Sequence, residues 1–559
     1  MDSVETIIGV VLFVIVTVSV TGFTGKFGWS APVALVVIGA IASFIPAVPT
    51  VEVEPDVILY AVLPPLLFAA AIHTSLIDIR ARLDSILLLS VGLVVFTVFT
   101  VGLTTWLVVP GITLAAGLAF GAVVAPTDTV AVNAVVGRLR LPRRLLTVLE
   151  GESLLNDAVA LVALNASILA ITSVVTPAMI GVDLLLAVGV GLAVGIGVGF
   201  LFAFIRSRLR APVLDTSLSL ITPYVTFIPA QLLHGSGVLA VVVAGLFLAY
   251  RSPTIQSASA RIAESINWRT IGFLLENAVF LIIGLSLADI VEAASEDFPD
   301  LWTTVMIIAA VLGAVFLARA VWVTLSFVAY TYGPGFLRDR RWGWRNSVAV
   351  GVAGVRGVVT LVAVLLLPPE TPHRAFLQLL AVIVIIGSLL AGLLLPTVIR
   401  KLRLPPPNAA QERTQRQLLM AEAQAAGLKL LDDLDLSGID QRVVRQLRDN
   451  ASFLADVGDL DAESDEPQLM AYAHLRKTMI RGERDAVIAA RQEGRFEEYA
   501  VQDVLSAIDA EEIALKTSAG GTIKGEVPRK PGMPPTFAVR GDAEAEGHPA
   551  GDPAGARSE

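Results

Sequence analysis

The residues with the clearest chemical potential lie in a short polar run inside an apolar segment. Glu150, Glu152, Ser153, Asn156 and Asp157 stand within eight positions, and the chain then continues through apolar residues. On a helix, Ser153 and Asp157 share one face, and Glu152 and Asn156 share the adjacent face. A charge at the centre of a bilayer costs roughly 2.5–3.5 kcal/mol, so such groups tend to face a cavity and handle an ion or a proton.

Two further segments combine polar residues with residues that interrupt helices. In the first, Pro126 precedes Thr127 and Asp128, and a proline removes a backbone donor and disfavours helix at the residue before it. The second places Arg356 among glycines at 351, 354 and 357. We predict two broken helices that cross in inverted orientation, an arrangement that indicates a transporter binding site. A kinked structural helix is the alternative for either segment.

The chemistry of these residues favours a small hard cation. Carboxylate, hydroxyl and amide oxygens are hard ligands, and a helix break frees carbonyls such as that of Thr127. Asp128 has a second interpretation as a helix cap, and Glu152 has one as the partner of a buried arginine. We expect Glu276, Arg319 and Arg356 to support the site through charge pairing. Phosphate-loop, zinc-protease and serine-hydrolase motifs are absent, so we expect a transporter without a cofactor rather than an enzyme.

The elements that must position these residues are membrane helices. Of 559 residues, 55% are hydrophobic and 16% are charged, which is typical of an all-α polytopic membrane protein. With 17–25 apolar residues per span, we expect about thirteen transmembrane helices. They lie near 4–22, 30–48, 56–72, 85–109, 111–136, 145–170, 179–205, 213–232, 237–250, 268–290, 301–328, 346–367 and 375–399.

The charges between these spans predict the topology. With thirteen spans, nearly all basic connectors fall on one side, which the positive-inside rule makes cytoplasmic. The N-terminus is then outside. The basic connectors contain Lys26, Arg80, Arg82, Arg138, Arg140, Arg143, Arg144, Arg206, Arg208, Arg210, Arg251, Arg261, Arg338, Arg340, Arg341, Arg345, Arg400, Lys401 and Arg403.

The composition changes after the membrane part, residues 1–404. Residues 405–518 are charged and rich in Ala and Leu, and we predict a mostly helical cytoplasmic tail. Residues 519–559 are typical of a disordered C-terminus. A passive tail and a regulatory or dimer-contacting tail are both compatible with this pattern. The absence of cysteine excludes disulfides and thiolate metal sites, and the charge pattern does not favour nucleic-acid binding.

Four motifs resemble the signature segments of the monovalent cation:proton antiporter 1 family. They are Gly151-Glu-Ser-Leu-Leu-Asn-Asp157, Ala125-Pro-Thr-Asp-Thr-Val-Ala-Val132, the segment 236–245 and Gly354-Val-Arg-Gly357. The resemblance implies thirteen helices with inverted repeats, a homodimer, and a core domain that moves like an elevator. It also implies that Asp157 carries the cation and the proton, with Thr127, Asp128, Glu152 and Ser153 around the ion and with Asn156 and Arg356 supporting the crossed helices. The sequence departs from many relatives at Ala69, where they have Glu.

We therefore expect exchange of Na⁺, or Li⁺, for H⁺ across the plasma membrane. The two ions would compete for Asp157, and the neutral amide of Asn156 predicts electroneutral one-for-one exchange. Ligand type does not distinguish Na⁺ from K⁺, so a K⁺/H⁺ antiporter is an alternative. A cation channel and a sensor with the tail as its output are less favoured, because no channel filter motif is present and Asp157 is intact.

Overall fold

The computed structural model describes most of the membrane part and small pieces of the tail. In the membrane part it describes residues 3–27, 30–46, 55–128, 141–173, 176–297, 300–333 and 343–404. All regular structure in these ranges is helical. The chain divides into two compact units, Met1–Asn408 and Ala409–Glu559.

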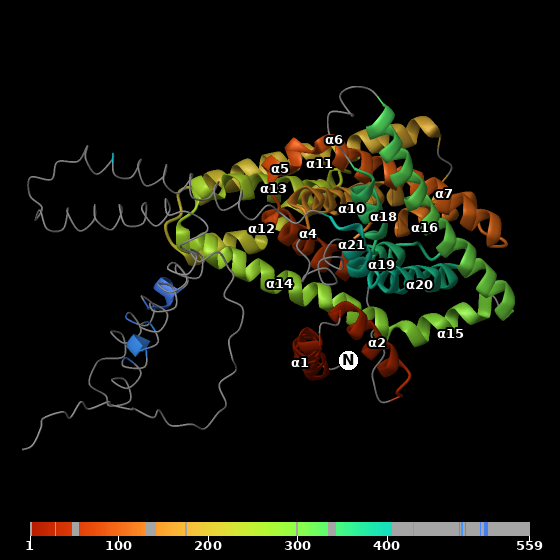
Figure 1. Cartoon of the computed structure of the whole chain (residues 1–559), viewed down its shortest axis with the longest axis horizontal. Helices are drawn as coiled ribbons and strands as arrows, with labels where there is room; N and C mark the ends of the chain where they lie inside the picture. Colours follow the sequence, from red (N-terminus) through yellow and green to blue (C-terminus); the bar gives the residue numbers. More distant parts are fainter. Residues whose placement is uncertain are drawn as a thin grey trace, which may run out of the picture. The chain divides into compact units, whose positions relative to one another are not determined.

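The first unit has the helices of a multi-pass membrane protein (Figure 1). Ten of the described helices are long and apolar enough to cross a membrane, and two shorter apolar helices accompany them. The all-α polytopic fold is confirmed, and the count of thirteen spans stays a prediction. The helices are α1 (Ser3–Phe27), α2 (Ala31–Ser43), α3 (Pro55–Val57), η1 (Ile58–Val62), α4 (Leu63–His73), α5 (Leu76–Ala81), α6 (Leu83–Leu87), η2 (Leu88–Gly92), α7 (Leu93–Val108), α8 (Leu114–Val124), α10 (Arg143–Thr172), α11 (Pro177–Arg206), α12 (Pro212–Leu232), α13 (Gly237–Ile255), α14 (Ala258–Leu285), α15 (Leu287–Asp297), α16 (Leu301–Tyr332), α18 (Trp344–Val352), α19 (Val358–Leu365), α20 (Arg374–Gly392) and α21 (Leu395–Leu402).

Many of these helices begin at residues that satisfy the free amide groups of the first turn. The hydroxyls of Thr113, Thr176, Ser236 and Ser257 each accept a hydrogen bond from a backbone N–H three residues later. Such caps replace partners that the first turn of a helix lacks. The membrane helices therefore start at defined residues.

The predicted break in span 346–367 is present, and in span 111–136 the helix ends where the other break is predicted. Helix α8 ends at Val124, and residues 125–128 are not helical. Helix α18 ends at Val352, and the chain is irregular before α19 begins at Val358. The breaks meet, because the N–H of Asp128 donates to the carbonyl of Val355 at 2.8 Å. The second half of the predicted span 111–136 lies outside the described residues.

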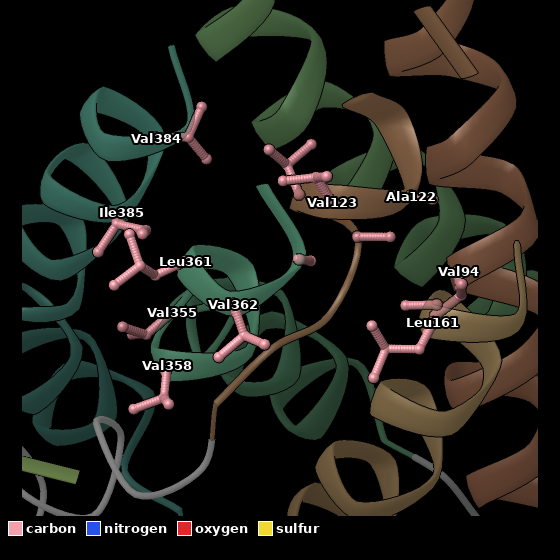
Figure 2. Packing of buried hydrophobic residues seen from close by; sticks show 14 of the residues in the cluster. Val94, Ala122, Val123, Leu161, Val355, Val358, Leu361, Val362, Val384 and Ile385 are labelled. Atoms are coloured by element: carbon pink, nitrogen blue, oxygen red, sulfur yellow. The ribbon is translucent and has the colours of Figure 1, made fainter. Parts of the chain in front are cut away.

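The crossing is surrounded by apolar side chains from several helices. Figure 2 shows Val123 of α8 and Val355 of the second break, with Leu361 of α19 and Val384 of α20 nearby. All four are almost fully buried. The irregular backbone is thus enclosed by protein, as non-helical segments at membrane depth must be.

The helices pack in two groups within the first unit. In one group α14 packs on α2 and α4, and α13 packs on α4, α11 and α12. In the other group α8 packs on α7, α10 and α19, and α16 packs on α7 and α18. Helices α4 and α14 of the first group face α10 and the two breaks of the second. The candidate site lies between these faces.

Two expectations about the connectors are wrong. Helix α14 begins at Ala258 rather than near residue 268, and Glu264 in its added turns forms a buried ion pair with Arg206. Arg206, expected in a solvated basic connector, is 1% exposed and pairs with Asp215 and Glu264. Between α14 and α16 the chain forms the short helix α15, which packs on α20.

The second unit is described only in small pieces. Arg484 pairs with Asp509 at 2.8 Å and with Glu512 at 2.5 Å. Most of the predicted helical tail, 405–518, and all of the predicted disordered end, 519–559, lie outside the described residues.

Candidate ion-binding site

A cavity of about 500 Å³ lies between α4, α10, α14 and the two helix breaks. Its polar lining comes from the carboxylates and hydroxyls of several helices, and its apolar lining comes mainly from α4. The lining residues are Leu63, Leu66, Leu67, Ala69, Ala70, His73, Thr74, Pro126, Thr127, Asp128, Glu150, Ser153, Leu154, Asp157, Trp268, Arg269, Gly272, Phe273, Glu276, Gly357, Val358, Val359 and Thr360.

Helices α10 and α14 each contribute a polar stripe to the cavity. On α10 the stripe runs from Glu150 through Ser153 to Asp157, and on α14 it joins Arg269 to Glu276. In both, the terminal residues are seven positions apart, so they lie on one face about 10 Å apart along the helix axis. Asp157 is only 8% exposed.

A hydrogen-bond network fixes the first break against α10 and α16. The Nδ2 of Asn156 donates to the Oγ1 of Thr127 at 2.9 Å and to its carbonyl at 3.3 Å. The Thr127 hydroxyl donates to Glu152 at 3.0 Å, and Arg319 forms an ion pair with Glu152 at 2.7 Å. Glu152 and Arg319 are both almost fully buried, at 1% and 2% exposed. Glu152 is not among the residues that line the cavity.

Two arginines donate hydrogen bonds to backbone carbonyls at the C-terminal ends of the interrupted helices. Arg319 donates from Nε and Nη2 to the carbonyl of Val350 near the end of α18, at 3.1 and 2.8 Å. Arg356 donates from Nε to the carbonyl of Val124, the last residue of α8, at 3.1 Å. The last carbonyls of a helix lack partners and carry partial negative charge, so cations are favourable there. The contacts explain how two breaks persist in an apolar environment.

Asp128 lies at the crossing and in the cavity wall. Its Oδ2 accepts a hydrogen bond from the N–H of Val358, the first residue of α19, at 3.4 Å. Gly357 permits this approach, because a Cβ atom there would collide with the Asp128 carboxylate. Asp157 and Glu276 line the same cavity as Asp128.

The structure brings together Thr127, Asp128, Ser153 and Asp157 in the cavity wall, as the sequence predicted for the site. It places Glu152 and Arg319 behind that wall, as a pair. Glu276, predicted only to support the site through its charge, lies in the wall itself. Sequence reasoning missed Arg269 and Thr360. The seven-residue spacing between Arg269 and Glu276 could have predicted that Arg269 lies on the same helix face as Glu276. No sequence pattern indicated Thr360.

Among the described residues, no three His, Cys, Asp or Glu side chains gather closely enough to hold a metal ion. The cavity carboxylates are therefore spread over its walls and do not form a cage. Hydroxyl and carbonyl oxygens have to supplement them when a small cation is bound.

Comparison with known sequences identifies related transporters. Residues 10–401 match the family model described as "Sodium/hydrogen exchanger, transmembrane". An uncharacterized Na⁺/H⁺ exchanger of Mycobacterium tuberculosis is 29% identical over 506 residues, which cover 87% of this chain and 91% of that protein. A sodium, potassium, lithium and rubidium/H⁺ antiporter of Bacillus subtilis is also 29% identical, over 70% of this chain and 60% of its own length.

Comparison with solved structures gives the same fold. The sodium proton antiporter MjNhaP1 of Methanocaldococcus jannaschii matches with a TM-score of 0.58 at 20% identity, covering 73% of this chain and 99% of that one. With the family match over most of the membrane part, these findings make this chain a multi-pass membrane transporter, and it belongs to the sodium/hydrogen exchanger family of cation/proton antiporters.

Proposed function

We propose that the protein exchanges Na⁺ for H⁺ at Asp157, one ion at a time. The observation that carries this proposal is a nearly buried carboxylate at the wall of a polar cavity, on the same helix face as the Ser153 hydroxyl. Thr127 and Asp128 lie in the same wall, at the end of the first break. Together they offer a small cation the charged and neutral oxygens that it requires.

The exchange follows from competition for a single carboxylate. Na⁺ binds the ionised Asp157, and a proton removes the charge that holds Na⁺. The loaded and the protonated sites are both close to neutral, so both can be carried across the membrane. The empty site keeps a bare charge, which is costly at that depth, and it therefore stays in place.

We assign Glu152 to the support of the site rather than to the ion. Its carboxylate forms an ion pair with Arg319 and accepts a hydrogen bond from the hydroxyl of Thr127. Its negative charge is therefore already compensated. The proposed ligands are Asp157 and Ser153 on α10 with Thr127 and Asp128 at the break, and Glu276 contributes charge from the opposite wall.

Membrane orientation and assembly complete the proposal. The N-terminus lies outside, the tail lies in the cytoplasm, and the protein works in the plasma membrane as a homodimer. The basic connectors support the orientation through the positive-inside rule. The likeness to the antiporter family supports the dimer.

Fluorescence of a pH dye in everted vesicles tests the exchange. Addition of Na⁺ or Li⁺ is expected to dissipate the imposed proton gradient in vesicles that contain the wild-type protein. Asp157→Asn is expected to abolish this response, because it removes the charge that both ions need at nearly constant volume. Appreciable Na⁺-dependent proton flux in a well-expressed Asp157→Asn variant would contradict the mechanism.

The same assay decides between Na⁺ and K⁺. The Bacillus subtilis relative is named for sodium, potassium, lithium and rubidium, so each of these ions is added in turn. A response to Na⁺ and Li⁺ alone is expected. A response of equal size to K⁺ would establish the alternative, a K⁺/H⁺ antiporter.

A further inference from the structure

The hydroxyl of Thr360 is buried at the cavity and is not among the ligands proposed above. Thr360 lies at the third position of α19, lines the cavity and is 0% exposed. Its hydroxyl has no hydrogen-bond partner among the described residues. A buried polar group without a partner is destabilising, so such a group requires an explanation.

The helix break removes one partner that this hydroxyl could otherwise have. Thr105 and Thr226, which lie inside continuous helices, each donate to the carbonyl four residues earlier, that of Val101 and that of Thr222. For Thr360 that residue is Arg356, which lies in the break before α19 begins. The interruption removes the acceptor that a continuous helix would provide.

The surroundings of Thr360 favour a positively charged ligand. Asp128, Asp157 and Glu276 line the same cavity, and a cation is favourable beside ionised carboxylates. A hydroxyl oxygen has two lone pairs and can serve as a neutral ligand of a hard cation. A water molecule is the other partner that could satisfy it.

We propose that the Thr360 hydroxyl is a ligand of the transported cation, supplied by the second broken helix. The inference rests on the proposed exchange at Asp157 and adds one neutral oxygen from α19 to the oxygens of α10 and the first break. A neutral ligand strengthens cation binding without adding a titratable group. Its loss should weaken binding of Na⁺ and leave proton binding at Asp157 unchanged.

The variant Thr360→Val separates these effects, because valine has nearly the same shape and lacks the hydroxyl. We expect the apparent KM for Na⁺ to rise about tenfold, the change that 1.4 kcal/mol of lost binding produces. The pH dependence of exchange at saturating Na⁺ should remain that of the wild type. Thr360→Ser keeps a hydroxyl and should restore the wild-type KM.

A binding measurement tests the same point without transport. Melting of the purified protein in detergent is compared in NaCl and in choline chloride. Na⁺ is expected to raise the melting temperature of the wild type, and this rise should shrink in Thr360→Val. Without Na⁺ the variant should be at least as stable as the wild type, because the unpartnered hydroxyl is gone.

Thr97→Val is the matched control. Thr97 in α7 is also 0% exposed and has an unpartnered hydroxyl among the described residues, but it does not line the cavity. It should leave both the KM for Na⁺ and the Na⁺-dependent rise in melting temperature unchanged.

A wild-type KM and a wild-type Na⁺ effect in Thr360→Val would overturn the inference and assign the hydroxyl to water. Equal losses in Thr97→Val and Thr360→Val would overturn it as well, since the effect would then be general. Absence of Na⁺-dependent exchange in the wild type would instead contradict the proposed function. The two failures are therefore distinguishable.

Discussion

Glu152 and Asp157 are five residues apart on one helix, yet their surroundings differ completely. Glu152 faces Arg319, whereas Asp157 faces the cavity. A carboxylate with a buried cationic partner is held as part of the structure, and one beside a polar cavity remains available to an ion. Position around the helix axis thus decides which of two similar side chains is paired with an arginine and which lines the cavity.

Glu152→Gln is expected to destabilise the protein, because it leaves Arg319 buried without its counter-charge. Removing one partner of a buried pair typically costs about 3–5 kcal/mol. Thermal melting in detergent should show the loss, and Glu150→Gln, on the same helix at the cavity wall, is the control. The double variant Glu152→Gln/Arg319→Gln should be more stable than the sum of the single losses predicts, by about 0.5–3 kcal/mol. Strict additivity would mean that the pair contributes nothing.

The sequence predicted that polar residues of this helix face a cavity, but it did not separate Asp157, which lines the cavity, from Glu152, which does not. Spacing places Ser153 with Asp157 and Asn156 with Glu152, and the structure agrees with both groupings. The partner of Glu152 lies 167 residues away, on a helix whose rotation the sequence does not specify. Thr360 was missed for a related reason, since its missing acceptor appears only when the exact start of α19 is known.

At the scale of elements, the two broken helices depend on each other. The N–H of Asp128 in one break donates to Val355 in the other, and Arg356 of the second break serves the carbonyl end of α8. We could predict where the helices break from the proline and glycine residues, because these residues act through local backbone chemistry. The contacts that make the breaks tolerable are distant in sequence and could not be predicted from it.

Arg356→Ala is expected to lower stability more than it alters ion selectivity. The variant leaves the carbonyl of Val124 at the end of α8 without its charged donor, within an environment that offers no replacement. Melting temperature and the Na⁺ to Li⁺ preference are measured together. An unchanged melting temperature with an altered preference would place Arg356 beside the ion instead.

The error at α14 shows how paired charges mislead a reading based on hydropathy. A network of side chains joins the four helices α11, α12, α13 and α14, with contacts of 2.8–2.9 Å. It consists of Arg206, Asp215, Gln256 and Glu264. Each residue alone is typical of a solvated connector. Their ion pairs and hydrogen bonds to one another, which hydropathy does not register, allow α14 to begin ten residues earlier than predicted.

At the scale of the whole molecule, the stoichiometry of exchange depends on how many carboxylates change their load. If Asp157 alone does so, one Na⁺ replaces one H⁺ and each half-cycle moves the same charge. The membrane potential, worth about 2.3 kcal/mol per charge per 100 mV, should then have no effect. In proteoliposomes with the potential clamped by valinomycin and K⁺, we expect the rate at fixed ion gradients to be independent of voltage.

A systematic dependence on voltage would show that a second carboxylate takes part. Asp128 and Glu276 are the cavity residues to examine, because both carboxylates line the same cavity as Asp157. Loss of the voltage dependence in Glu276→Gln, with exchange retained, would identify Glu276 as that group. The neutral Asn156 would then no longer account for the stoichiometry.

The reciprocal contacts at the crossing also govern how the protein is made. Val124 and the arginine that serves its carbonyl are 232 residues apart, so the ribosome releases the first half of the crossing long before the second. At 5–20 residues per second the interval is roughly 10 to 50 s. During it the nascent chain exposes an uncapped helix end within the translocation machinery or the lipid. Biogenesis of this transporter therefore includes a period in which α8 exists without the segment that caps its end.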